Sequence, residues 1–146
     1  MIPRDLLLSR DRQGGARPRD AGAQTNLGLA LALARRFDEA IACLQTAVTA
    51  SPDSIEYRFN LGRVLAAAGR FAEAIPQFER AVQLSGGREA QILDMLAGAY
   101  AETGRFPEAA RAARQALEAA GQSNPQFADT LKSRISFYES RIPKGR

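Results

Sequence analysis

A short phrase recurs three times in this chain at almost constant spacing. Arg-Phe, any residue, Glu and Ala occupy positions 36–40, 70–74 and 105–109, so the intervals are 34 and 35 residues. A period in this range is typical of a solenoid, in which one supersecondary unit cannot bury its apolar face alone and stacks on its neighbours. The repeat therefore predicts an array of short units, an architecture that favours binding over chemistry.

The composition favours helices as the content of these units. The chain has 146 residues, of which 45% are hydrophobic, 7% are aromatic and none is Trp. That apolar content supports a packed core in one compact unit, and the abundance of Ala, Leu, Arg, Glu and Gln favours helix over sheet. We therefore expect an all-α fold.

Each unit carries two apolar stripes at helical spacing. In the first unit they contain Leu27 and Leu31, then Ala40, Leu44 and Ala47. Spacings of three and four residues place each set on one side of a helix. We expect two helices of about fourteen residues in each unit.

The turn between these helices has its own signal. Gly69 and Gly104 close the first helix of their units, where a left-handed residue is needed, and Phe71 and Phe106 then begin the second helix. Arg35 stands at the equivalent place in the first unit, which predicts a turn there that is either strained or differently shaped.

Three segments, 21–54, 55–88 and 90–123, match one another in phase. They share Leu-Gly or Leu-Ala at 27–28, 61–62 and 96–97, with a small residue at Ala40, Ala74 and Ala109. This pattern resembles the tetratricopeptide repeat, a helix-turn-helix unit of 34 residues, over about 70% of the chain. The resemblance implies an all-α, right-handed α-solenoid.

The two ends differ from the repeats. Residues 124–141 carry an apolar stripe with a charged opposite face, which predicts a C-terminal capping helix followed by a tail at 142–146. Residues 1–20 show no such stripe and are expected to be a flexible or degenerate segment. Pro18 is nevertheless in phase with Pro52, so an alternative is the remnant of an earlier repeat.

The resemblance implies that the first helix of each unit lines a concave groove that binds an extended peptide or a partner helix. The candidate groove residues are Asn26, Leu29, Glu56, Phe59, Asn60, Arg63, Gln91 and Asp94.

Asn26 and Asn60 are the sharpest pair in this groove, because an amide both donates and accepts and can hold a peptide backbone. They are similar to the asparagine ladder of the repeats in O-linked N-acetylglucosamine transferase, although Met95 breaks the series. The alternative is that each amide bonds a neighbouring helix. Phe59 is either a binding anchor or a packing residue against the first unit. Arg63 is expected to form a surface ion pair with Glu56.

The net charge of +4 does not indicate nucleic acid once it is divided along the chain. Residues 21–123 hold ten Arg against eleven Asp or Glu, so the basic excess lies in the two terminal segments. A surface that follows phosphates needs its cations on the array itself. We therefore expect no nucleic-acid partner.

The inventory of reactive side chains is small. The chain has no His, and Cys43 is its one cysteine, so we expect no catalytic residue, cofactor or metal and assign Cys43 to packing. Adjacent Asp38 and Glu39 suit a helix start, and 86–87 lack the Lys of a phosphate loop.

No apolar run reaches the length of a membrane span. We therefore expect a soluble protein without direct membrane insertion, cytoplasmic by default.

These observations favour a non-catalytic protein–protein interaction or scaffold module. The alternative is that the array is an accessory or C-terminal portion of a larger bacterial enzyme, such as a glycosyltransferase. Self-association through an uncapped N-terminal repeat is a further option.

Overall fold

The computed structural model describes residues 18–144, which contain seven α-helices and no strand. The helices are α2 (Pro18–Leu33), α3 (Phe37–Ala50), α4 (Ile55–Ala67), α5 (Phe71–Ser85), α6 (Ala90–Glu102), α7 (Phe106–Ala120) and α8 (Pro125–Ser140).

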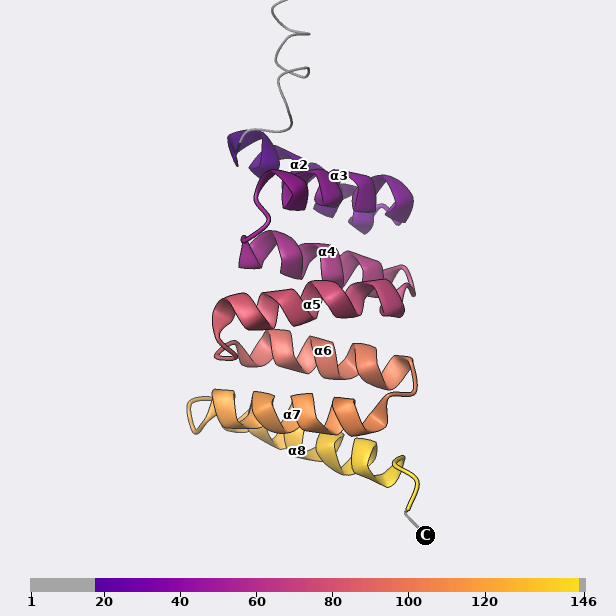
Figure 1. Ribbon diagram of the computed structural model, residues 1–146, viewed down its shortest axis with the longest axis vertical. Helices are drawn as coiled ribbons and strands as arrows, with labels where there is room; N and C mark the ends of the chain where they lie inside the picture. The colour runs from indigo at the N-terminus through magenta and orange to yellow at the C-terminus, as the bar shows by residue number, and fades with distance from the viewer. Residues whose placement is uncertain (1–17, 145–146) are drawn as a thin grey trace, which may run out of the picture.

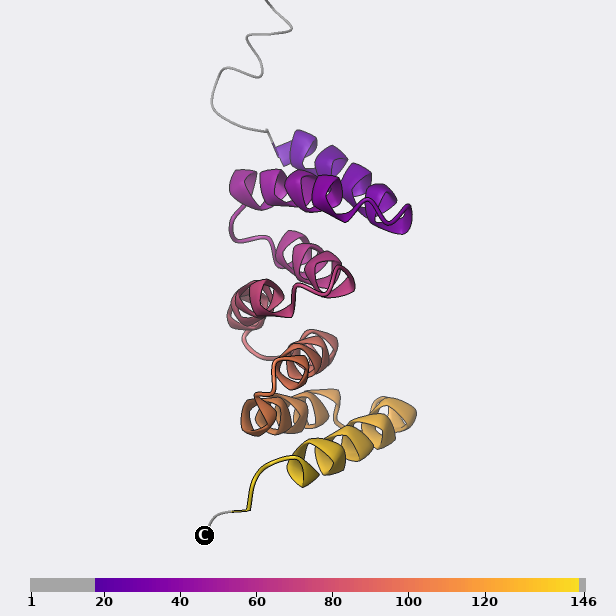
Figure 2. The ribbon, with the colours of Figure 1, turned by 90° about the vertical axis from the view of Figure 1, so that its right-hand side faces the viewer.

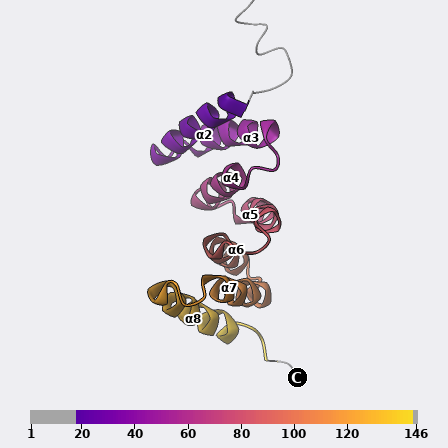
Figure 3. The same ribbon diagram turned by 90° about the vertical axis from the view of Figure 1, so that its left-hand side faces the viewer.

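The helices stack along one direction from α2 to α8 (Figure 1). Views from the two sides show two columns, with α2, α4 and α6 in one and α3, α5 and α7 in the other (Figures 2 and 3). Each first helix packs against the second helix of its own repeat and against the second helix of the preceding repeat. The chain is therefore an elongated stack in which each repeat contacts its neighbours.

The recurring phrase forms the start of every second helix. α3, α5 and α7 begin at Phe37, Phe71 and Phe106, as the sequence predicts. Glu39, two residues after Phe37, accepts from the Arg36 guanidinium at 2.6 Å, and Glu73 accepts from Arg70 at 2.6 Å. Arg105 and Glu108 pair in the same way. The acidic member also complements the positive end of the helix dipole.

The turn before each second helix has one shared geometry. Gly69 and Gly104 both have φ 78°, and Arg35 takes φ 60° at the same place in the first repeat. The amide of the next residue then donates to a carbonyl five residues back, as in Arg70 N to Leu65 O at 2.8 Å. The left-handed glycines are confirmed, and the first turn keeps the shape of the others, with Arg35 in the left-handed region that is strained for a residue with a Cβ.

Two glycines allow the paired helices to approach closely. A Cβ added at Gly62 would lie 2.6 Å from Cε1 of Phe78, and one at Gly28 would lie 2.8 Å from Cγ of Leu44. Phe78 and Leu44 are themselves fully buried. In the first two repeats, the glycine of the first helix therefore accommodates a fully buried side chain of the second helix.

Helix α8 closes the C-terminal end of the stack. Asn124 caps it, with its Oδ1 accepting from the amide of Phe127 at 3.1 Å. Leu131 of α8 is fully buried and packs with Leu93 and Ala116 in a second core cluster beside the main one.

At the other end, α2 begins at Pro18, so residues 18–20 belong to the first helix rather than to the segment before it. The predicted segment 1–17 and the end of the tail at 145–146 lie outside the described residues. Among the described helices, none has the length and apolar character needed to cross a bilayer.

Two glycine substitutions should change stability in opposite directions. Gly62→Ala should lower the free energy of unfolding by about 1–3 kcal/mol, because the buried Phe78 ring cannot move away from the new methyl group. Gly98→Ala should raise it by about 0.5–1 kcal/mol, since a Cβ at Gly98 meets nothing within 4 Å and alanine is the better helix former. Urea titration followed by circular dichroism measures both. Equal effects of the two substitutions would contradict the packing described for Gly62.

Candidate functional site

Helices α2, α4 and α6 form one continuous surface, here called the first-helix face. α4 contacts both α2 and α6 directly, whereas α5 has no comparable contact with α3 or α7 in the described range 18–144. The first helices are therefore closer together than the second helices, so the first-helix face lies on the inner side of the stack. All eight predicted groove residues belong to these three helices.

Asn60 is the buried polar residue at the centre of this face. It is 7% exposed, and its side chain has no hydrogen-bond partner among the described residues. The expected bond to a neighbouring helix is therefore not made in this part of the chain. Asn26, its repeat equivalent on α2, is exposed. The two amides thus occupy equivalent positions in very different surroundings.

Phe59 and Arg63 form a stacked pair beside Asn60. The Phe59 ring lies 5.9 Å from the ring of Phe78 at an angle of 54°, and the Arg63 guanidinium lies 5.7 Å above Phe59. The half-buried Phe59 therefore packs on α5 of its own repeat while Arg63 covers its outer side. The predicted ion pair between Arg63 and Glu56 is wrong: these two residues do not pair, and Glu56 is exposed.

Apolar side chains extend this centre to both neighbours. Leu29 of α2 and Met95 of α6 are half-buried and pack on the main core cluster, as Phe59 does. Gln91 is exposed at the start of α6. The first-helix face thus has apolar groups from three consecutive repeats and exposed polar groups at its ends.

Asp94 has a different role from the other predicted groove residues. Its Oδ2 accepts from Arg134 of α8, and its Oδ1 is buried without a hydrogen-bond partner in the described residues. Burial, followed by the charge of Asp94, raises the pKa of nearby Tyr138 above its ordinary value. Asp94 therefore connects the first-helix face to α8. Sequence periodicity could not reveal this contact, because the partners are forty residues apart.

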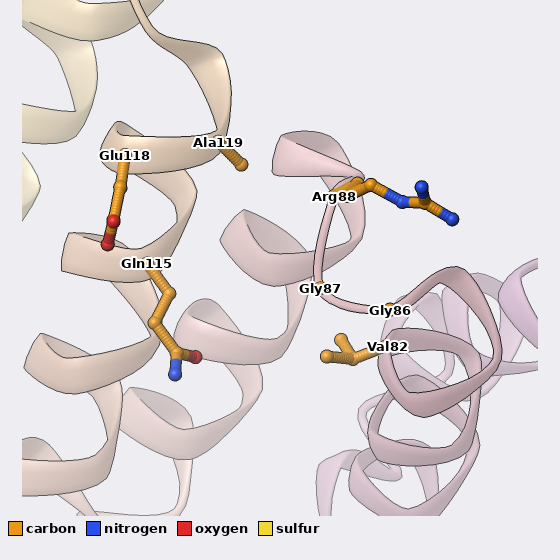
Figure 4. Close-up of a pocket in the computed structure, with 7 residues that line it drawn as sticks. All are labelled: Val82, Gly86, Gly87, Arg88, Gln115, Glu118 and Ala119. Atoms are coloured by element: carbon orange, nitrogen blue, oxygen red, sulfur yellow. The ribbon is translucent and has the colours of Figure 1, made fainter.

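Two clefts lie on the opposite side, between the second helices. The larger, of about 410 Å³, is bounded by α5, the loop at 86–88 and α7 (Figure 4). Gln115 and Glu118 project from α7, while the guanidinium of Arg88 points away from that helix. None of the predicted groove residues lines it. The 35-residue interval between Phe71 and Phe106, one residue longer than the other interval, includes this loop.

The smaller cleft, of about 300 Å³, lies between α5 and α7, with Leu96 and the buried Tyr100 of α6 also lining it. Its polar groups are largely paired with one another. Tyr100 donates to Glu79 at 2.6 Å, and Arg105 lies 4.7 Å above the Tyr100 ring while pairing with Glu108. Burial, then the hydrogen bond to Glu79, raises the pKa of Tyr100 to about 12. No group of three or more potential metal ligands occurs among the described residues.

Comparison with known families identifies the array. A family model described as tetratricopeptide repeat matches residues 7–55, 34–89 and 59–125, which together span most of the chain. The chain belongs to the tetratricopeptide repeat family. A comparison with curated protein sequences gives no match.

Solved tetratricopeptide-like structures superpose on this chain over most of its length. SycD from Yersinia enterocolitica, in complex with a peptide of the translocator YopD, has a TM-score of 0.73 at 15% identity and covers 82% of this chain and 92% of its own. PcrH in complex with the chaperone binding region of PopD has a TM-score of 0.77 at 15% identity, covering 88% and 98%. MamA MSR-1 has a TM-score of 0.65 at 31% identity, and the match covers 73% of this chain and 61% of that chain. These likenesses agree with the all-α solenoid.

Removal of Arg134 should destabilise the repeat stack measurably. Arg134→Ala leaves the largely buried Asp94 carboxylate without its cation and should lower the free energy of unfolding by about 1–2 kcal/mol. A fully buried pair would lose more, but Arg134 is partly exposed and solvent screens its charge. Arg114→Ala is the matched control, since the Arg114–Glu139 pair is about half exposed on both sides and should change stability by at most about 0.5 kcal/mol. Urea titration of both variants measures the difference. Equal losses would contradict a special role for Asp94.

Tyr100 should titrate late in alkaline solution. The tyrosinate absorbance should include a group with a midpoint near 12, and Glu79→Gln should lower this midpoint only in part, because burial, the larger cause of the raised pKa, remains. The sign for stability follows from the raised pKa in the folded state: the contribution is complete below pH 10 and is lost as pH rises towards 12. Tyr100→Phe assigns the signal. A midpoint unchanged by Glu79→Gln would refute the contribution assigned to Glu79.

Proposed function

We propose that this protein is a non-catalytic interaction module that binds an extended peptide or a partner helix on its first-helix face. The observation that carries the proposal is the Asn60 amide, which is 7% exposed and has no side-chain partner among the described residues. Among the described residues only Asp94 Oδ1 is a fully buried side-chain atom without a partner, so the Asn60 amide still reaches the surface, where a ligand can bond it. A bound peptide backbone supplies both a donor and an acceptor for the amide.

The surroundings of Asn60 suit a peptide. Leu29, Phe59 and Met95 provide half-buried apolar surface on three successive helices, and Arg63 adds a cation above the Phe59 ring. Apolar anchors with a polar rim are the arrangement in which a few residues contribute most of the binding energy. Asn26 then offers an exposed amide one repeat away.

Known tetratricopeptide structures support this use of the fold. SycD is seen with a peptide of YopD, and PcrH with the chaperone binding region of PopD. At 15% identity these likenesses extend to the fold alone, so the ligand of this chain is inferred from its own residues.

The clefts between the second helices are weaker candidates for the same role. Tyr100, Glu79, Arg105 and Glu108 satisfy one another there, which leaves few groups to orient a ligand. The acidic residues at the helix starts are likewise engaged by the preceding arginines. A binding role on the first-helix face is therefore preferred to a catalytic role in either cleft.

Substitutions on the first-helix face should abolish capture of specific partners. With the full chain as bait, quantitative mass spectrometry should show that Asn60→Ala and Phe59→Ala each reduce partner recovery at least about tenfold, since they remove the central amide and the aromatic anchor. Circular dichroism confirms that each variant is folded.

The matched control carries Gln115→Ala and Glu118→Ala, which change the opposite side of the stack. This variant should recover the wild-type set of partners. Retention of every specific partner by both first-helix variants, or loss only in the control, would overturn the proposal.

A further inference from the structure

Arg63 is an exposed cation on the first-helix face without an acidic partner in the described part of the chain. Its guanidinium lies 5.7 Å from the centre of the Phe59 ring, and its N–H groups donate no hydrogen bond within residues 18–144. A cation–π contact supplies no acceptor for these donors. The guanidinium is therefore held in place by Phe59 while its N–H groups stay available to another molecule.

The other arginine of α4 is already engaged. Arg58 donates to Pro52 O at 3.0 Å and to Gln77 Oε1 at 3.1 Å, so its side chain is directed towards α5. α6 carries no arginine or lysine, and Arg134 of α8 already forms an ion pair. Arg63 is therefore the cation that α4 and α6 offer to a ligand.

Two acidic residues mark the edges of this surface. Glu56 lies two turns before Arg63 on α4, Glu102 lies at the end of α6, and both are exposed. Neither pairs with Arg63 within the described chain. A ligand acid placed near either of them would be repelled, whereas one placed at Arg63 would be attracted. The charges therefore favour a ligand with one acidic group rather than a run of them.

Arg63 lies on the same side of α4 as Asn60, because three residues separate them. Asn60 is 7% exposed, and its amide has no hydrogen-bond partner in the described range. A ligand main chain that bonds this amide therefore passes beside the guanidinium. The two residues can thus recognise one segment, with Asn60 at its backbone and Arg63 at a side chain.

The Asn60 amide favours an extended ligand over a helical one. A helix uses its own backbone donors and acceptors internally, whereas an extended segment leaves them free for a side-chain amide. Apolar groups flank Asn60 on both sides, Leu29 on α2 and Met95 on α6, so a ligand can continue in both directions. The acceptor for Arg63 is therefore expected from a side chain within the segment rather than from its C-terminal carboxylate.

The first-helix face has an open position beside Arg63. The repeat equivalents of Arg63 are Leu29 on α2 and Gly98 on α6, and a Cβ added at Gly98 meets nothing within 4 Å. Met95 lies one turn before Gly98 and is half-buried. Packed helices lie about 8–10 Å apart and an extended chain advances about 3.3 Å per residue, so a large apolar side chain about three residues from the ligand acid would reach Gly98.

We propose that the ligand of the first-helix face is an extended peptide segment that places one Asp or Glu side chain on Arg63 and a large apolar side chain over Gly98, about three residues away. This inference rests on the proposed function and adds the chemical class of its ligand. The carboxylate accepts charge-assisted hydrogen bonds from the guanidinium, whose planar fork matches carboxylate geometry. The Phe59 ring holds the guanidinium before the ligand arrives, which lowers the entropy lost on binding.

Peptide selection tests this ligand class with the full chain. A random library of linear peptides on phage is selected on the immobilised protein, and enriched sequences should share one acidic residue with Leu, Met, Phe or Trp about three positions away. These sequences are then synthesised with amidated C-termini, so that a terminal carboxylate cannot contribute. Replacement of the acid by Gln should weaken binding at least about tenfold, measured by isothermal titration calorimetry.

Two variants of the protein test the two contacts separately. Arg63→Glu should weaken binding of the acidic peptide at least about tenfold and should bind a peptide with Lys in place of the acid more tightly than the original. Gly98→Leu should also weaken binding, and a peptide with Ala in place of its large apolar residue should bind this variant as it binds the wild type. Arg63 is exposed and Gly98 has open space, so both variants should fold, which circular dichroism verifies. The matched control is Arg111→Glu, the same charge change at an exposed position of α7, which should bind as the wild type does.

The outcomes separate this inference from the proposed function. Peptides that lose binding with Asn60→Ala but tolerate Gln at the acid, or bind Arg63→Glu as tightly as wild type, would refute this inference and leave the proposed function intact. The same conclusion follows if only peptides with a free C-terminus bind, or if Gly98→Leu changes nothing. Enriched peptides that are unaffected by both Asn60→Ala and Phe59→Ala, or a selection without any enriched sequence, would refute the proposed function and this inference with it.

Discussion

Coverage of the apolar side of each first helix by the second helix of the preceding repeat is the constraint on which this structure depends. Leu61 and Leu96 are nearly fully buried because a second helix precedes each of them, and their equivalent Leu27 is half exposed because the described chain places no helix there. Stability in such an array comes from contacts between neighbours, so no repeat is complete alone. The ends of the array are therefore where large apolar side chains stay exposed, Leu27 and Leu33 on α2 and Phe137 on α8.

Within a repeat, a small set of contacts fixes how the two helices meet. A glycine on the first helix accommodates a large side chain of the second, as Gly62 does for Phe78, and a left-handed residue closes the turn between them. The Arg–Glu pair at the start of each second helix is exposed and contributes modestly to stability. Close packing thus determines how the two helices of a repeat meet, and the acidic members of the charged pairs interact favourably with the positive ends of the helix dipoles.

The same geometry separates the two sides of the stack. First helices contact one another across repeats, which gathers Leu29, Phe59 and Met95 on one surface with Asn60 among them. Second helices diverge and leave clefts whose polar groups pair internally around Tyr100. Binding is therefore expected where apolar groups and an unpartnered amide coincide. α8 limits that surface at its C-terminal end through Arg134 and Asp94.

The repeat period and the helical spacing of apolar residues were sufficient to predict the all-α solenoid, the helix starts at Phe37, Phe71 and Phe106, and the turn at Arg35, because these features depend on local sequence. The candidate site was predicted only as a set of positions on the first helices. The tertiary structure decided that Asn60 is buried while Asn26 is open, that Arg63 stacks on Phe59 instead of pairing with Glu56, and that Asp94 faces α8. The physical reason is that burial and pairing depend on which residues of distant helices come together, and a periodic sequence assigns equivalent positions without equivalent neighbours.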